Sequence, residues 1–157
     1  MKVTPIRRVQ ASPYADTVWL LQANIDDQTP EQLSFAAELL MQNGALDCWF
    51  EPIYMKKGRP AIKLCVLCKR REQEKLCRLL FQHTSTIGIR KSKFQRQIMQ
   101  RSFVDVHTIY GDVQVKVCRY HDIEKHSVEF ESAKRAALAH HVSIEQVMRE
   151  TLSKFCD

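Results

Sequence analysis

The sequence predicts an α+β fold in which a ferredoxin-like βαββαβ unit is followed by a β-hairpin and two C-terminal helices. Apolar and polar residues alternate at 17–27, as is typical of a strand. Three further segments are strand-like: 46–55, which is rich in aromatic and apolar residues, 61–68, which is compact and apolar, and 87–98, which is long and charged. Apolar residues recur at helical spacing in the two segments that complete the βαββαβ order: 30–43 and 71–83. The remaining chain has a different pattern, with an alternating hairpin and two helical segments: 103–117, 129–140 and 144–155.

This pattern divides the chain into three parts. Residues 1–16 carry no periodicity and contain two prolines, so we expect an irregular N-terminal arm. Residues 17–99 form the predicted ferredoxin-like subdomain, whose two helices should cover one face of a four-stranded antiparallel sheet. Residues 100–157 form the predicted β-hairpin and two-helix subdomain.

The first strand runs directly into a helix start and ends in two adjacent carboxylates, Asp26 and Asp27. Thr29 is suited to the N-cap, Pro30 to the first helical position and Gln32 to the third, which together make a capping box. Because the helix fixes the end of the strand, the two acids lie at a rigid rim where a hard cation and its phosphate ligands could bind. The alternative is that acids before a helix are favoured by its dipole alone.

Two further motifs have the chemistry of phosphate binding. The predicted turn with Lys56, Lys57 and Arg59 offers three cations and a glycine, although lysines also protect exposed strand edges. The junction after the second helix offers three consecutive hydroxyl groups and a following arginine: Thr84, Ser85, Thr86 and Arg90. The alternative for these hydroxyl groups is local bonding at the end of the helix.

The C-terminal part contains fewer signals. Gly111 and Asp112 are expected to form a two-residue hairpin turn, and residues 119–127 a polar loop. Glu129 and Glu131 stand at the start of a helix, where they either bind a metal ion or merely favour the helix dipole. The last helix begins with Ser143 as its cap and Gln146 three residues later.

Composition limits the class of protein. Lysine and arginine number 24 against 18 acidic residues, a formal net charge of +6, which favours partners that carry phosphate. The first residues have no apolar signal-peptide core and no segment is long enough to span a membrane, so we expect a cytoplasmic protein. The six cysteines are too few for a disulfide scaffold, and most are expected to be reduced and buried.

Two other function classes remain open on this pattern. A ferredoxin-like sheet can bind RNA or another nucleotide without catalysis, but no RNA-recognition signature with its aromatic residues occurs here. A pure assembly domain is the other alternative, since the apolar side of the first strand, with Val18 and Leu20, would suit an oligomer.

Several motifs occur together in an order that resembles the C-terminal domain of the LarC family of nickel-insertion proteins. The motifs are Asn24-Ile25-Asp26-Asp27-Gln28-Thr29-Pro30-Glu31, Gly44-Ala45-Leu46-Asp47, Met55-Lys56-Lys57-Gly58-Arg59-Pro60, Thr84-Ser85-Thr86-Ile87-Gly88-Ile89-Arg90 and Tyr110-Gly111-Asp112-Val113-Gln114-Val115-Lys116-Val117. The resemblance runs from about Val18 to the C-terminus. It departs where the family often reads K-P-E-Y-E-D and this chain has Ser127-Val128-Glu129-Phe130-Glu131-Ser132.

The resemblance implies a cyclometallase, a lyase-class enzyme of lactate racemase maturation. It would insert Ni²⁺, a substrate, into pyridinium-3,5-bisthiocarboxylic acid mononucleotide, using CTP with Mg²⁺ or Mn²⁺. This chain would be the CTP-binding half, would need a separate N-terminal LarC portion for full activity, and would form a trimer or hexamer.

The resemblance and the charged motifs together give a hypothesis for the site. Asp26 and Asp27 would position the divalent ion on the triphosphate, and Glu129 and Glu131 are further candidate metal ligands. The triphosphate would be held by the cations and hydroxyl groups of the two phosphate motifs: Lys56, Lys57, Arg59, Thr84, Ser85, Thr86 and Arg90.

Overall fold

The computed structural model describes residues 14–156, which form two compact units. One unit is Ala15–Arg96, and the other contains Tyr14 and residues 97–156. The irregular arm predicted for residues 1–16 lies largely outside the described residues. No helix in the described part of the chain is long and apolar enough to cross a membrane.

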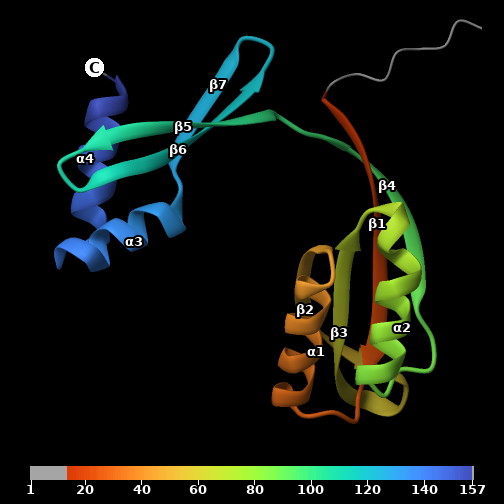
Figure 1. Ribbon diagram of the computed structural model, residues 1–157. Helices are drawn as coiled ribbons and strands as arrows, with labels where there is room; N and C mark the ends of the chain where they lie inside the picture. Colours follow the sequence, from red (N-terminus) through yellow and green to blue (C-terminus); the bar gives the residue numbers. More distant parts are fainter. Residues whose placement is uncertain (1–13, 157) are drawn as a thin grey trace, which may run out of the picture. The chain divides into compact units, whose positions relative to one another are not determined.

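The first unit, called here the ferredoxin-like unit, has a four-stranded sheet in the order β2-β3-β1-β4. Its elements are β1 (Ala15–Ile25), α1 (Pro30–Gln42), β2 (Ala45–Met55), β3 (Arg59–Cys68), α2 (Gln73–His83) and β4 (Arg90–Gln97). Strand β3 pairs antiparallel with both β1 and β2. Figure 1 shows α1 and α2 on the same face of this sheet, as the sequence predicts.

The core of this unit lies between the helices and that face of the sheet. Leu21, Ala23 and Ile25 of β1 are buried there, since alternate residues of a strand point to one face. Leu33 and Leu40 of α1 complete the packing from the other side, together with residues of β3 and α2. This buried core holds the strands and helices together and so positions the loops at the ends of the sheet.

The second unit has a three-stranded antiparallel sheet in the order β5-β6-β7, together with two helices. Its elements are β5 (Gln100–Thr108), β6 (Gly111–Tyr120), β7 (Ile123–Val128), α3 (Phe130–His140) and α4 (Ile144–Cys156). Val113 of β6 packs with alanines of α3 and with Val147 of α4. Val115 and Val117 are buried in an adjoining cluster beside Phe155.

Both predicted capping boxes are present. In α1, the backbone N–H of Gln32 donates to Thr29 Oγ1 (3.4 Å), and the backbone N–H of Thr29 donates to Gln32 Oε1 (3.0 Å). In α4, the backbone N–H of Gln146 donates to Ser143 Oγ (3.2 Å), and the backbone N–H of Ser143 donates to Gln146 Oε1 (3.1 Å).

Two of the predicted segments in the second unit were wrong. The hairpin turn consists of Ile109 and Tyr110, because Gly111 pairs with Thr108 and belongs to β6. Thr108 Oγ1 closes this turn by donating to the Gly111 carbonyl oxygen (2.8 Å) and accepting from the Tyr110 amide (3.0 Å).

The polar loop predicted at 119–127 is also wrong, since it contains the end of β6 and most of β7. Tyr120 pairs with Ile123, so His121 and Asp122 form a two-residue turn, with His121 at φ 51°. The side chains of β7 are exposed from Ile123 to Ser127. The strand therefore has no buried face to produce an alternating apolar pattern.

The fourth strand begins at Arg90, three residues later than the sequence predicts. The preceding residues form a turn stabilised by a threonine hydroxyl group. Thr86 Oγ1 donates to the Gly88 carbonyl oxygen (2.9 Å) and accepts from the Gly88 amide (3.4 Å). Such local side-chain bonds compete with strand pairing.

The described cysteines are free, and those on β2 and β3 are wholly or partly buried, in line with the prediction of reduced thiols. Burial raises the pKa of Cys48 to about 12 and that of Cys68 to about 11. Neither side chain therefore forms a reactive thiolate near neutral pH.

Candidate functional site

The first carboxylate of the predicted pair lies beside an arginine from another strand. Asp26 follows β1 and Arg59 begins β3, two strands that are neighbours in the sheet. Arg59 Nη1 lies 3.2 Å from Asp26 Oδ2, and the side chains are 59% and 23% exposed, respectively. Both side chains of the pair are thus accessible to solvent.

The second carboxylate contacts the junction after α2. Ser85 Oγ donates a hydrogen bond to Asp27 Oδ1. The Ser85 amide donates to Gln28 Oε1 (2.8 Å), and Gln28 Nε2 donates to the His83 carbonyl oxygen (3.4 Å). Three contacts therefore join the end of β1 to a segment more than fifty residues later in the chain.

The start of β4 also contacts the end of β1, because Arg90 Nη2 donates a hydrogen bond to Asn24 Oδ1. The predicted acidic rim, the basic turn and the hydroxyl junction thus each contribute a side chain to one end of the sheet. We call this group the carboxylate rim; its members are Asn24, Asp26, Asp27, Gln28, Arg59, Ser85 and Arg90.

The turn between β2 and β3 carries two further cations, Lys56 and Lys57. Lys56 and Lys57 are exposed, and neither has a hydrogen-bond or ion-pair partner among residues 14–156. Lys57 has φ 63° and Gly58 has φ 67°, so the tip of the hairpin is tightly turned. Both ammonium groups remain available to an anionic ligand at this end of the sheet.

Thr84 and Thr86 use their hydroxyl groups locally. Thr84 is buried, and its Oγ1 donates to the Leu80 carbonyl oxygen of α2 (2.6 Å). Thr86 Oγ1 donates to the Gly88 carbonyl oxygen. These contacts match the alternative role considered for this segment, in which hydroxyl groups terminate the helix. Ser85 is the hydroxyl residue of the three that contacts a rim carboxylate.

The two glutamates belong to the second unit. Glu129 precedes α3 as its N-cap, and its amide donates to the Gln114 carbonyl oxygen (2.8 Å). Glu131 lies in the first turn of α3, where Oε2 is 3.5 Å from Lys134 Nζ. The Glu129 carboxylate makes no capping hydrogen bond, whereas Glu131 lies in the first turn, where the helix dipole favours an acid.

Asn24 and Gln28 lie in the rim but were not among the predicted site residues. The signal for Asn24 was its position two residues before Asp26, which places both side chains on one face of β1. Gln28 had no comparable signal, because its partners His83 and Ser85 become neighbours only when the chain folds.

A cavity of about 300 Å³ adjoins the rim. Asp26 and Gln28 form its polar part, while Tyr54 and Pro60 of the β2–β3 hairpin contribute to its largely apolar wall. The cavity thus places an apolar and aromatic surface next to a carboxylate and its arginine partner.

The rim has the charge balance for a metal-bound polyphosphate. Within the rim Arg59 and Arg90 balance Asp26 and Asp27, and Lys56 and Lys57 of the adjoining turn bring the local formal net charge to +2. Among the described residues, no group of three or more His, Cys, Asp or Glu side chains could hold a metal ion. Two carboxylates supply only part of the ligand shell of a divalent ion, and Mg²⁺ commonly completes its shell with phosphate oxygens and water.

Comparison with known proteins identifies the family. The family model described as "Nickel insertion protein" matches residues 3–148. The pyridinium-3,5-bisthiocarboxylic acid mononucleotide nickel insertion protein of Lactiplantibacillus plantarum is 46% identical over 138 residues, which cover 88% of this chain and 33% of that protein. The protein of the same name from Alkaliphilus metalliredigens is 45% identical over 117 residues, covering 74% of this chain and 28% of that protein. This chain therefore spans about a third of the length of these curated relatives.

The fold also matches a solved structure. The structure is the apo form of LarC2, described as the C-terminal domain of a cyclometallase involved in the synthesis of the NPN cofactor of lactate racemase. The two chains are 44% identical with a TM-score of 0.84, and the match covers 91% of this chain and 99% of that one. The resemblance stated from the sequence motifs is thus confirmed, and the chain belongs to the nickel insertion protein family, with the fold of its C-terminal domain.

Proposed function

We propose that this domain binds CTP with Mg²⁺ or Mn²⁺ at the carboxylate rim and serves as the nucleotide-binding half of a nickel insertase. The substrates of the complete enzyme would be Ni²⁺ and pyridinium-3,5-bisthiocarboxylic acid mononucleotide, the molecule named for the relatives described above. The observation that supports this most is the convergence of three distant segments through the Asp26–Arg59, Asp27–Ser85 and Asn24–Arg90 contacts.

The proposed binding step exchanges ion pairs rather than creating new charges. In the structure, Arg59 neutralises Asp26. When the nucleotide binds, Asp26 and Asp27 would face the divalent ion, which supplies charge neutralisation on the triphosphate. Arg59, Arg90 and the two lysines would then contact phosphate oxygens, and arginine can engage two oxygens at once.

The cavity beside Asp26 is the proposed site for the base. A planar pyrimidine would lie against the apolar wall that includes Tyr54 and Pro60. Beyond its bonds to His83 and Ser85, the Gln28 side chain keeps one N–H and one lone pair at the polar side of the cavity. A donor and an acceptor together are the kind of group that distinguishes cytosine from uracil.

The other parts of the proposal follow from the family. Glu129 and Glu131 stay candidate metal ligands, to be tested in the same way as the rim acids. Full activity would need an N-terminal LarC portion, and the domain would assemble as a trimer or hexamer, which light scattering measures directly.

The test is calorimetric titration of CTP with Mg²⁺ into this chain and its variants. We expect Asp26→Ala and Arg90→Gln each to weaken binding by about tenfold or more, since each removes a charge-assisted contact. Asp47→Ala serves as the control, because Asp47 is an exposed carboxylate outside the rim. Unchanged affinity in both rim variants would remove the carboxylate rim from the nucleotide site.

A further inference from the structure

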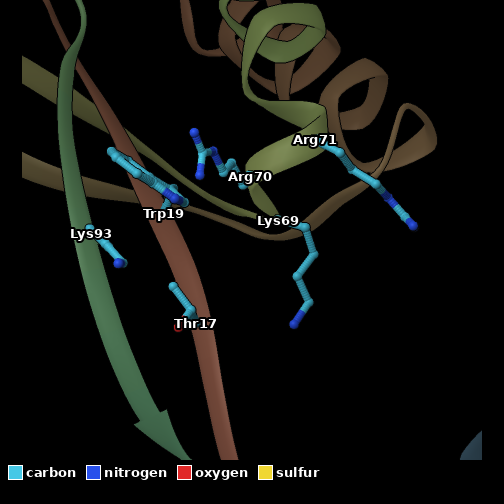
Figure 2. Close-up of a pocket in the computed structure, with 6 residues that line it drawn as sticks. All are labelled: Thr17, Trp19, Lys69, Arg70, Arg71 and Lys93. Atoms are coloured by element: carbon cyan, nitrogen blue, oxygen red, sulfur yellow. The ribbon is translucent and has the colours of Figure 1, made fainter. Parts of the chain in front are cut away.

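A second cavity, of about 470 Å³, lies near the start of β1, whereas Asp26 follows its end. Strand β1 and β4 form one side of this cavity, and the segment between β3 and α2 forms the other (Figure 2). The residues that line it are Thr17, Trp19, Lys69, Arg70, Arg71 and Lys93. Four cations and an aromatic ring therefore surround one cavity, and no carboxylate is among these lining residues.

Two of the four cations are already neutralised. Lys69 is paired with Asp16, and Arg71 Nε lies 2.9 Å from Glu72 Oε1. The side chains of Arg70 and Lys93 are exposed and have no ion-pair or hydrogen-bond partner in the described part of the chain. Their charges are therefore available to an anion.

The available cations flank the aromatic ring. Figure 2 shows the Arg70 guanidinium group and Lys93 on either side of the Trp19 indole, with Thr17 on the same side as Lys93. Trp19 is half-buried, because part of its ring packs against the core of the ferredoxin-like unit. The ring is thus held in a fixed position while another part of it remains on the cavity wall.

We propose that this cavity is a second nucleotide site, which binds a pyridinium-type mononucleotide carrying carboxylate groups. The planar ring stacks on Trp19, and its carboxylate group contacts Arg70 on one side of the indole. The phosphate group contacts Lys93 and accepts a hydrogen bond from the Thr17 hydroxyl group on the other side. The volume is within the roughly 300–1,000 Å³ of small-molecule sites. The choice of a pyridinium ring rests on the proposed function, since it follows from the substrate of the relatives.

The two sites differ in the anions that they suit. The carboxylate rim contains acids, so a metal ion would lie between these acids and an anionic ligand. In the cavity lined by Trp19, called here the Trp19 cavity, the Arg70 and Lys93 side chains have no carboxylate partner among residues 14–156. A mononucleotide with free carboxylate and phosphate groups therefore binds them without a metal ion. One domain would then hold the polyphosphate and the acceptor mononucleotide at different ends of the same strand.

The experiment uses fluorescence of Trp19 and nicotinic acid mononucleotide, a pyridinium carboxylate with a ribose monophosphate. The full chain carries Trp49→Phe, which leaves Trp19 as the single tryptophan. We expect saturable quenching by the mononucleotide. Arg70→Gln and Lys93→Gln should each weaken binding by about tenfold. Lys75→Gln, which removes an exposed lysine of α2 outside the cavity, should leave affinity unchanged.

Three results would overturn the inference: absence of quenching, quenching that both variants leave unchanged, and displacement of the mononucleotide by an equal concentration of inorganic phosphate. CTP with Mg²⁺ that quenches Trp19 as tightly would overturn the choice of a pyridinium ring. A chain that binds the mononucleotide but not CTP supports this site and contradicts the proposed function alone. A chain that binds CTP at the rim but not the mononucleotide contradicts this inference alone.

Discussion

The two units of the chain hold their charged side chains in different ways. In the ferredoxin-like unit, Arg71–Glu72 is the one local ion pair among the described residues. The Arg59–Asp26, Lys69–Asp16 and Arg96–Asp16 pairs join residues 33, 53 and 80 positions apart. In the described part of the second unit, each ion pair joins residues at most five positions apart: Arg119–Glu124, Glu131–Lys134 and Glu145–Arg149. The hydrogen-bonded His107–Asp112 pair also spans five positions.

This difference distinguishes local geometry from assembly of a site. Short-range pairs form because residues three to five positions apart are already neighbours on a helix or across a hairpin. When such pairs are exposed, they add little to stability. Long-range pairs form only when the fold brings distant segments together. Both sites proposed here lie where such pairs occur, with Asp26 at one end of β1 and Asp16 at the other.

The largest effect is expected in the core that fixes both ends of β1. Leu21 is fully buried between the sheet and the helices, so Leu21→Ala should lower the free energy of unfolding by about 2–5 kcal/mol. Tryptophan fluorescence during urea unfolding measures this, because Trp19 and Trp49 both belong to the ferredoxin-like unit.

The matched control is Leu46→Ala in β2, where the side chain is 41% exposed. We expect this change to cost less than about 1 kcal/mol, since exposed substitutions leave no cavity. Equal losses in the two variants would show that the packing around Leu21 does not determine the stability of the unit.

The next effect concerns the long-range pairs at Asp16. Hydrogen bonds from Arg96 and then Lys69 lower the pKa of Asp16 from 3.8 to about 2. The ionised carboxylate therefore stabilises the folded chain above pH 3.8, and this contribution is lost as the pH falls from 3.8 to about 2. We expect Asp16→Asn to cost on the order of 1–2 kcal/mol near neutral pH and to flatten the dependence of stability on pH in that window.

Urea unfolding at several pH values measures this effect. The variant should keep some acid sensitivity, because hydrogen bonds from Lys63 and then Trp49 and Cys65 also lower the pKa of Glu51, to about 2. Asp47→Asn, an exposed carboxylate on β2, is the control and should follow the wild-type curve. If Asp16→Asn follows that curve too, the pair contributes nothing to stability.

The sequence predicted those parts of the fold that depend on neighbouring residues. Thr29 with Gln32 and Ser143 with Gln146 mark helix starts by chemistry within one turn, and both are present. The apolar stripe with Leu33 and Leu40 predicted the buried face of α1. The motifs and their order predicted the family, which the comparisons confirm.

The features that the sequence did not predict depend on tertiary contacts or lack a buried face. Strand β7 has exposed side chains from Ile123 to Ser127, so its pattern could not be distinguished from a polar loop. The Trp19 cavity joins Trp19 to Arg70 and Lys93, which only the pairing of strands and the position of α2 bring together. The same reason explains why Gln28 was missed at the carboxylate rim.

The smallest effect is expected at the two capping boxes, which are alike in chemistry but differ in position. Thr29→Ala and Ser143→Ala should each cost about 1 kcal/mol, because each leaves an amide at the helix start without its acceptor. Thermal unfolding followed by circular dichroism measures both changes. Only Thr29 adjoins the carboxylate rim, since Asp27 and Gln28 immediately precede it.

Calorimetric titration of CTP with Mg²⁺ then separates the two variants. Thr29→Ala should weaken binding severalfold because the segment that carries Asp27 and Gln28 loses its anchor at the helix start, whereas Ser143→Ala should bind as the wild type does. Thr29→Ser, which keeps the hydroxyl acceptor, should restore both stability and affinity. Equal weakening by the alanine changes at both caps would mean that affinity follows overall stability, and that the rim is not held in place by the start of α1.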